Sequence, residues 1–482
     1  MKFYNTIVLR KLLIIALILV SNTQIQAQRT YTLQECIDQA FKNNITIKQR
    51  ELNQRSVQAD QQQSKLNLLP SINGQATNNY NIGFAINPVT NTTQNNATFR
   101  SNNFAVSSSV TLFNGFQNIN NIKQQNANAK ATDADVLATK NNIALSVSNV
   151  YLQVLMNAEI AAARELQIQS TAEQLKRQEK LYELGGANKV KLLQLKAQYA
   201  NEESQLITAQ TQLDQSYLTL WQLLNIAPDP NNKVQKPDSA TTTNLPNEIL
   251  NADFIYKSFL DKSPEVQAAK NRTDAARLAH SIAIGGRSPR LTVGGSISSF
   301  YSTQTQQGVG TPTQFLIPIG QDISGNPSPY FTPITRYGSS EVVPFGDQFD
   351  KNLGKNVGFT LSVPIFNGYQ VSTNIQKTRI NQMSSELTQK QTEMDVYKNV
   401  NQAYLDFKSS QKRYESNVNN YAANKEAMTV AEAQFNLGAL STADFIVTKS
   451  QYLQAETNLV QAKYELLFRR KVLDFYLGKG LY

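Results

Sequence analysis

The sequence has one histidine, one cysteine and one tryptophan among its 482 residues. Because His280 is the only imidazole, clusters of histidine ligands cannot form, and a Ser/His/Asp arrangement has no support. No phosphate-binding loop of the Gly-x-x-x-x-Gly-Lys type occurs in the chain. We therefore do not expect an enzyme, and we predict no catalytic residue, no cofactor and no metal site.

The single cysteine and the charge pattern exclude two further classes. Cys36 cannot form a disulfide within the chain, and because it lies well past the cleavage point expected for a signal peptide, we expect no lipid anchor at this residue. The formal net charge is +10, but lysines and arginines are scattered, and the longest basic run is Arg469-Arg470-Lys471. Nucleic-acid binding normally needs basic residues clustered on one face. We therefore expect no nucleic-acid partner.

The N-terminus has the pattern of a secretory signal peptide. Basic residues precede an apolar core of nine residues, Leu12–Val20, and the small residue Ala27 follows a short polar stretch. A membrane anchor is the alternative, but a spanning helix needs about 18 to 20 apolar residues, twice the length of this run. We predict residues 1–27 as a signal peptide and a mature chain that starts near Gln28.

The rest of the chain repeats itself once. A shift of 253 residues aligns Phe113-Asn114-Gly115 with Phe366-Asn367-Gly368, without a gap from Phe113 to Asn225. A shift of 219 aligns the segments before these, for example Pro70 with Pro289, so 253 − 219 = 34 residues are inserted between about Ser302 and Asn356. The period is far longer than that of a solenoid repeat. The sequence predicts a first repeat at 28–225, a linker at 226–248 and a second repeat at 249–482.

Each repeat contains one very long predicted helix. Residues 119–184 and 371–437 contain neither proline nor glycine, and their apolar residues recur at steps of three and four. At about 1.5 Å per residue, each helix would be roughly 100 Å long, more than a compact domain can hold. Shorter helices are expected before these, at about 33–68 and 253–284, and after them, at about 188–225 and 441–477.

Both long helices end in Leu-Gly, at Leu184-Gly185 and Leu437-Gly438. Glycine is the usual left-handed residue after a helix, and Asn188 and Ser441 are good N-caps for the helix that follows. The sequence therefore predicts two helical hairpins with tight tips.

Four shorter segments alternate between apolar and polar residues, which is typical of strands. They lie at about 71–84, 100–113, 290–301 and 356–366, and an outer loop at about 302–355 separates the last two. Helices so long cannot fold back over the apolar faces, which favours lipid as the covering medium and a membrane barrel. Four strands cannot close a barrel, so several copies must contribute: two would give eight strands and three would give twelve.

The chain resembles the TolC-like outer membrane efflux proteins. The resemblance rests on the doubled architecture, Leu68 to Ile72 before the first strand, the Phe-Asn-Gly segments at Phe113 and Phe366, and the Leu-Gly tips. It implies a homotrimer, with a 12-stranded barrel in outer membrane lipid and a 12-helix barrel in the periplasm. It also implies a periplasmic adaptor protein and an inner-membrane transporter of the RND or ABC type as partners.

The resemblance also assigns roles to the hairpin tips. Leu184, Gly185, Asn188, Leu437, Gly438 and Ser441 are expected to dock the adaptor, and Asp444 matches an aspartate of the periplasmic aperture. Leu440 and Val447 depart from the polar residues found there in the family. From the residues alone, Asp444 is also an acid that completes a capping box with Ser441, and the residues favour this structural role. Both interpretations of Asp444 stay open.

The sequence favours a passive exit duct for small-molecule efflux or type I secretion, located in the cell outer membrane. The alternative is a trimeric structural or adhesive stalk. The paired tips favour the duct, because a stalk has no need to end in hairpins.

Overall fold

The computed structural model describes residues 30–86, 93–186, 188–236, 251–321, 323–327 and 329–479. The predicted signal peptide and residues 237–248 of the predicted linker lie outside these ranges. The chain forms two compact units. The first contains Met1–Gln58, Ala127–Thr273 and Ser384–Tyr482, and the second contains Ala59–Asn126 and Asp274–Met383.

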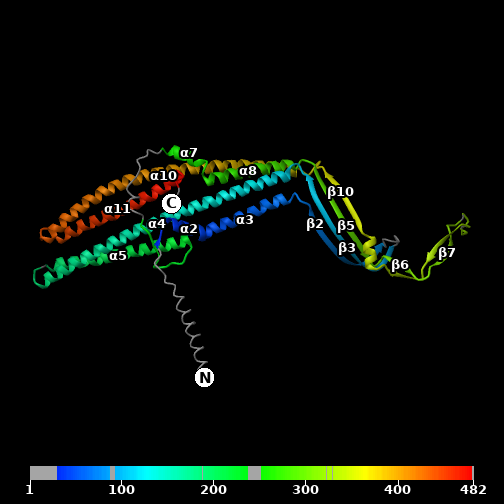
Figure 1. Ribbon diagram of the computed structural model, residues 1–482, viewed down its shortest axis with the longest axis horizontal. Helices are drawn as coiled ribbons and strands as arrows, with labels where there is room; N and C mark the ends of the chain where they lie inside the picture. Colours follow the sequence, from blue (N-terminus) through cyan, green and yellow to red (C-terminus); the bar gives the residue numbers. More distant parts are fainter. Residues whose placement is uncertain are drawn as a thin grey trace, which may run out of the picture. The chain divides into compact units, whose positions relative to one another are not determined.

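Two helical hairpins dominate the first unit. Helices α4, Gln117–Glu183, and α10, Gln370–Asn436, are each 67 residues long, and their last parts lie in this unit. Each turns back into a shorter helix, α5 at Lys189–Leu224 and α11 at Thr442–Tyr476. Figure 1 shows the hairpins α4/α5 and α10/α11 with their tips at the same end of this unit.

The main core of this unit joins both hairpins. Tyr151 and Leu155 of α4 pack with Trp221 of α5 and Tyr464 of α11, and α2 adds Ile37. The Tyr151 hydroxyl donates to the backbone carbonyl of Gln235 at 2.6 Å. This residue lies beside β4, Lys233–Val234, which pairs in parallel with β1, Thr30–Tyr31. The apolar stripes of α4 are therefore covered by helices from both halves of the sequence.

The two incoming helices are each broken, whereas the sequence predicted one continuous helix in each repeat. The first consists of α2, Leu33–Asn43, and α3, Ile45–Leu66; the second consists of α7, Ala252–Leu260, and α8, Pro264–Gly285. Asn44 leaves the helical conformation, donates to the Leu223 carbonyl at 3.0 Å and accepts from the Thr46 amide. Ser263, at the equivalent position, precedes a proline, which disfavours helix.

A four-stranded antiparallel sheet forms in the second unit. Its strands are β2, Ser71–Ile86; β3, Thr93–Phe113; β5, Arg290–Ser302; and β10, Gly354–Ser362. The order is β10-β5-β3-β2, so the pair β3 and β5 joins the two halves of the sequence. Compared with the predicted segments, β3 starts earlier and β10 ends earlier, before Pro364, which cannot donate to a ladder.

The register of the strands gives the sheet one apolar and one polar face. Cross-strand partners share a face, and Phe359 pairs with Val293, which pairs with Val110. The neighbouring position brings Thr360, Thr292 and Thr111 together on the other face. The first face also carries these exposed apolar residues: Ile72, Tyr80, Ile82, Val106, Ile297, Val357 and Leu361.

The segment expected to be an outer loop, 302–355, contains regular structure. Strands β6, Gln306–Val309, and β9, Ser339–Val342, form one ribbon, and β7, Thr313–Pro318, and β8, Phe331–Arg336, form another. The short helix α9, Phe345–Lys351, packs Phe345 and Phe349 against Phe104 of the sheet. The prolines of this segment suggested irregular structure, but an edge strand tolerates proline.

Candidate functional site at the hairpin tips

The tip of the first hairpin is a left-handed turn. Gly185 has a φ of +76°, and its amide donates to the Tyr182 carbonyl while the next amide, of Gly186, donates to the Leu181 carbonyl. These two bonds form a Schellman motif, which satisfies the last carbonyls of α4. Asn188 then caps α5, because its side chain accepts from the Val190 amide at 2.9 Å. Leu184 is left 84% exposed at the apex.

The tip of the second hairpin repeats this geometry. Gly438 has a φ of +74°, and its amide and that of Ala439 donate to carbonyls of the last turn of α10. Leu437 is 85% exposed. The same pair of features, a left-handed glycine and an exposed leucine, therefore marks both tips of the protein.

Asp444 interacts closely with the cap of α11. Its backbone amide donates to the Ser441 hydroxyl oxygen at 3.1 Å, and that hydroxyl donates to the Asp444 carboxylate at 2.6 Å. A carboxylate in the first turn of a helix is also favoured by the helix dipole. The side chain nevertheless remains exposed. Asp444 thus takes part in the cap of α11 and at the same time presents an exposed carboxylate at the tip.

An apolar cluster holds the second tip together. Phe435 and Phe445 stack with ring centroids 4.4 Å apart, and Ala431 completes the buried group. Leu440 packs against this cluster, whereas Val447 is 56% exposed. Leu440 therefore stabilises the turn by apolar contact, at a position where the family resemblance led us to expect a polar residue.

The two tips contact each other through charged side chains of the first hairpin. The Lys191 ammonium lies 4.3 Å from the centre of the Phe435 ring. Lys191 occupies the repeat position of Asp444, since 191 + 253 = 444. The same position in the two halves thus carries opposite charges, and the first tip uses its charge for a cation–π contact with the second.

The residues that sequence reasoning missed lie further along the hairpins. Lys449 of α11 forms an ion pair with Glu202 of α5 at 3.2 Å and donates to the Thr171 hydroxyl of α4 at 2.6 Å. The Glu202 carboxylate also accepts from that hydroxyl, from Gln167 and from Gln198. The pKa of Lys449 is lowered, because burial disfavours its charged form more than Glu202 favours it. Nothing in the sequence indicated this burial, because a charged residue in a helical pattern usually lies on the surface.

The sequence and the fold match those of known outer membrane proteins. A profile of the outer membrane efflux protein family covers residues 36–225 and 255–479. The chain belongs to this family. Among curated efflux proteins, the outer membrane efflux protein BepC of Brucella suis biovar 1 (strain 1330) is 21% identical over 465 residues, which are 95% of this chain and 88% of the relative.

Solved structures of membrane channels share the fold. The structure of CusC aligns with a TM-score of 0.73 at 18% identity and covers 95% of this chain and 96% of that chain. The outer membrane channel CmeC of Campylobacter jejuni aligns with a TM-score of 0.72 at 16% identity and covers 93% of this chain and 86% of that one. The protein is therefore an outer membrane transport protein with the efflux channel fold, and it is not an enzyme.

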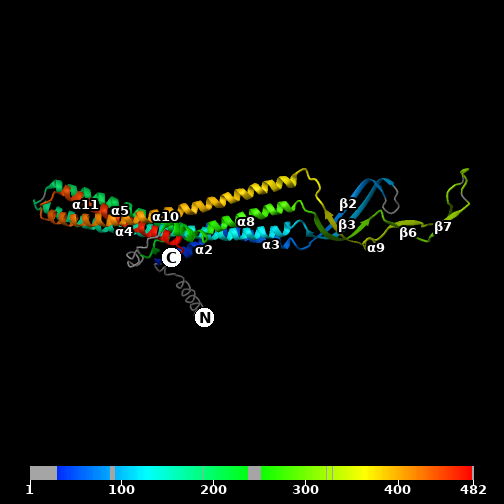
Figure 2. The same cartoon turned by 90° about the horizontal axis from the view of Figure 1, so that it is seen from above.

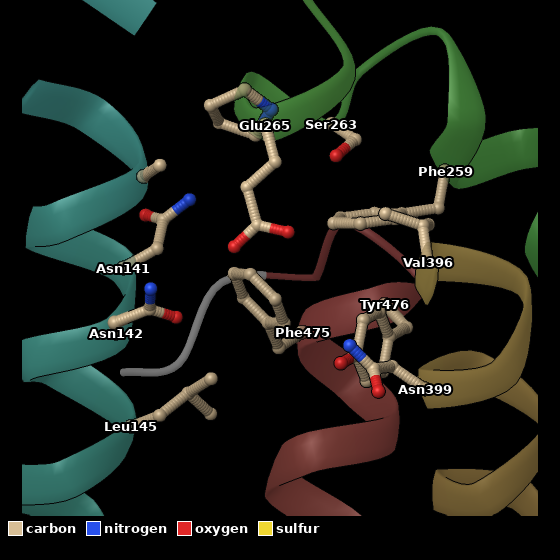
Figure 3. A pocket seen from close by; sticks show the side chains of 12 residues that line it. Asn141, Asn142, Leu145, Phe259, Ser263, Glu265, Val396, Asn399, Phe475 and Tyr476 are labelled. Atoms are coloured by element: carbon tan, nitrogen blue, oxygen red, sulfur yellow. The ribbon is translucent and has the colours of Figure 1, made fainter. Parts of the chain in front are cut away.

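The protein also has a small cavity, which Figure 3 shows with the side chains that line it. It measures about 70 Å³ and lies among Asn141 of α4, Phe259 of α7, Glu265 of α8 and Phe475 of α11. Such a volume holds a few water molecules at most. In the described part of the chain, no group of three or more His, Cys, Asp and Glu side chains is arranged for a metal ion. The cavity is too small for a transported molecule.

Proposed function

We propose that the protein is a passive outer membrane exit duct, built from three copies of the chain, for efflux of small molecules or type I secretion. Three copies would bring twelve strands into one barrel and twelve helical segments into one tunnel. A periplasmic adaptor and an inner-membrane transporter of the RND or ABC type would supply the substrate and the energy. The hairpin tips would be the end that meets these partners.

The sheet is the observation that carries this proposal. Among the described strands, β10 and β2 each have one edge without a partner, although lipid does not tolerate open edges. The apolar face, with Phe359 and Val357 among its exposed residues, suits lipid, and the polar face suits a wet lumen. Pairing β10 with β2 of the next copy closes the barrel. A twelve-stranded barrel from three copies would have an open lumen, whereas the interior of an eight-stranded barrel from two copies would be filled by side chains.

Contacts between the two halves indicate how copies would meet. Within the chain, Gly115 and Gly285 approach so closely that a Cβ on either would lie 2.4 Å from the other's carbonyl oxygen. The repeat equivalent of Gly115 is Gly368, which has the same left-handed conformation but open space around it. We infer that Gly368 packs against the end of α3 from the next copy, as Gly115 packs against α8 within the chain.

Aromatic side chains lie at both ends of the sheet, as expected for the two membrane interfaces. At the helix end, Phe113 packs edge-on against Phe116, and Phe366 packs in the same way against Tyr369. Phe116 and Tyr369 both have positive φ, which is strained for bulky residues and is repeated in both halves. At the other end, α9 adds a second aromatic group. The sheet between them would lie in lipid.

Native mass spectrometry of the detergent-solubilised protein tests the copy number. The proposal predicts three copies of a chain that starts near Gln28. A monomer, or a particle that stays in solution without detergent, would contradict the barrel.

A pair of substitutions at one position tests the docking role of the tips. Gly438→Val places a branched side chain at a φ of +74°, whereas Gly438→Asn keeps a residue that tolerates this conformation. No atom lies within 4 Å of the added Cβ, so backbone strain alone would separate the two variants. We expect the Val variant to assemble but lose export in the native host, and the Asn variant to retain it. Equal export by both variants would count against docking at this turn.

A further inference from the structure

The insertion of the second repeat contains an exposed two-stranded ribbon, which we call the outer ribbon. It consists of β7 and β8, and the Ile319 amide extends its ladder by donating to the Tyr330 carbonyl at 2.7 Å. Figures 1 and 2 both show it extending beyond the four-stranded sheet, at the end that carries α9 and away from α3 and α8. In the described structure, this ribbon has no third strand.

Both faces of the outer ribbon are apolar. Phe315 pairs with Ile334, and Ile317 and Ile319 continue the same face, because alternate residues of a strand point the same way. On the other face, Leu316 pairs with Pro333, and Pro318 pairs with Phe331. The exposed apolar residues of the ribbon and its turn are Phe315, Leu316, Ile317, Ile319, Ile323, Tyr330 and Phe331.

An isolated two-stranded ribbon is at best marginally stable in water, so this one needs cover. Its sequence also lacks the charges that usually protect exposed strands: residues 303–342 contain only Asp322, Arg336 and Glu341. The Arg336 guanidinium lies over the Phe315 ring, 5.9 Å from its centre. A single engaged cation provides little attraction for an anionic lipid surface, whereas near-neutral ribbons can approach one another without repulsion.

We propose that the outer ribbons of neighbouring copies pack together, the Phe315 face of one against the Phe331 face of the next. This inference rests on the proposed trimer. In a ring, each copy has two neighbours, which matches a ribbon with two faces to cover. The insertion also joins β5 to β10, the edge strand at which the next copy must pair, so it carries the ribbon close to the boundary between copies. The packed ribbons form an apolar collar beyond the outer end of the barrel.

Cross-linking of the full-length protein in membrane vesicles tests this contact. The double variant Phe315→Cys/Phe331→Cys places one thiol on each face, too far apart within one ribbon for a short bismaleimide. Face-to-next-face packing gives each copy two cross-links, so we expect a covalent trimer on a denaturing gel. Each single variant should stay predominantly monomeric, because its thiol faces a neighbour's unmodified side chain.

Two controls make the result specific. Wild type tests the background, because Cys36 is buried and burial raises the pKa of its thiol to about 12, which keeps it protonated and unreactive. Asp347→Cys, on the exposed side of α9 in the same insertion, should stay monomeric. If native mass spectrometry of the double variant shows three copies but the gel shows only monomers, the ribbon contact is wrong and the trimer stands. If three copies are absent from the native spectrum, the proposed function itself fails.

Discussion

Lys449 and Glu202 form an ion pair whose side chains are only 3% and 2% exposed. It joins α11, from the second repeat, to α5, from the first. The repeat equivalent of Lys449 is Lys196, which pairs with Glu179 at 3.0 Å but is 50% exposed. Glu432, the equivalent of Glu179, remains near Lys449 and favours its charged form. The lysine at this repeat position thus has a different role in each half: Lys196 stays on the surface, whereas Lys449 links the hairpins.

Replacing Lys449 should therefore be far more costly than replacing Lys196. Lys449→Met leaves a buried carboxylate without its partner, which typically costs about 3–5 kcal/mol, whereas an exposed pair contributes roughly 0–1 kcal/mol. Denaturant unfolding followed by helical circular dichroism measures both variants. The double variant Lys449→Met/Glu202→Leu should recover much of the loss, because no unpaired charge remains. Equal effects of Lys449→Met and Lys196→Met would contradict the structure.

The lowered pKa of Lys449 predicts a dependence on pH. Between this lowered value and the usual 10.5, the unfolded chain keeps a proton that the folded chain has released. The free energy of unfolding then rises with pH in this window. Lys449→Met lacks this contribution, so the stability difference between wild type and the variant should grow as the pH approaches 10.5. A difference that stays constant up to that pH would show that the buried amine is not destabilised in its charged form.

Neighbouring residues of β10 test which face of the sheet meets lipid. Phe359, 72% exposed on the apolar face, and Thr360, on the polar face, differ by one position in the same strand. A lysine on the lipid face near the middle of the bilayer costs about 2–4 kcal/mol, whereas the lumen tolerates it. We expect Phe359→Lys to reduce the yield of folded oligomer in lipid vesicles, while Thr360→Lys folds normally. The reverse result would invert the assigned faces.

Asp444→Asn separates the two interpretations of this residue. Asparagine keeps the shape and can still interact with Ser441, but it removes the charge. If three carboxylates approach one axis at the tips, the variant channel in planar bilayers should lose part of its cation preference. We expect only a modest change in open probability, because Leu440 packs in the apolar cluster and Val447 is uncharged. Unchanged ion selectivity with a lower melting temperature would identify Asp444 as a cap alone.

The elements that the sequence predicted well are those set by local chemistry. Proline-free and glycine-free runs indicated the long helices, and Gly185 and Gly438 marked the turns because few other residues adopt a left-handed conformation freely. The alternation of apolar and polar residues located the four strands of the sheet, although their ends differ by several residues.

The elements that the sequence did not predict depend on contacts between distant segments. The break at Asn44 is fixed by a hydrogen bond to Leu223, which no local pattern reveals. The pairing of Lys449 with Glu202 needs α5 and α11 side by side, and both residues look like ordinary surface charges in sequence. The outer ribbon was missed because Pro318 and Pro333 suggested irregular structure.

Electron cryomicroscopy of the protein in lipid nanodiscs tests the central claim most directly. The account predicts a three-fold particle in which β10 of each copy pairs with β2 of the next, with a continuous lumen and with six hairpin tips at the end away from the lipid. A particle without three-fold symmetry, or with β10 and β2 still unpaired in lipid, would contradict it.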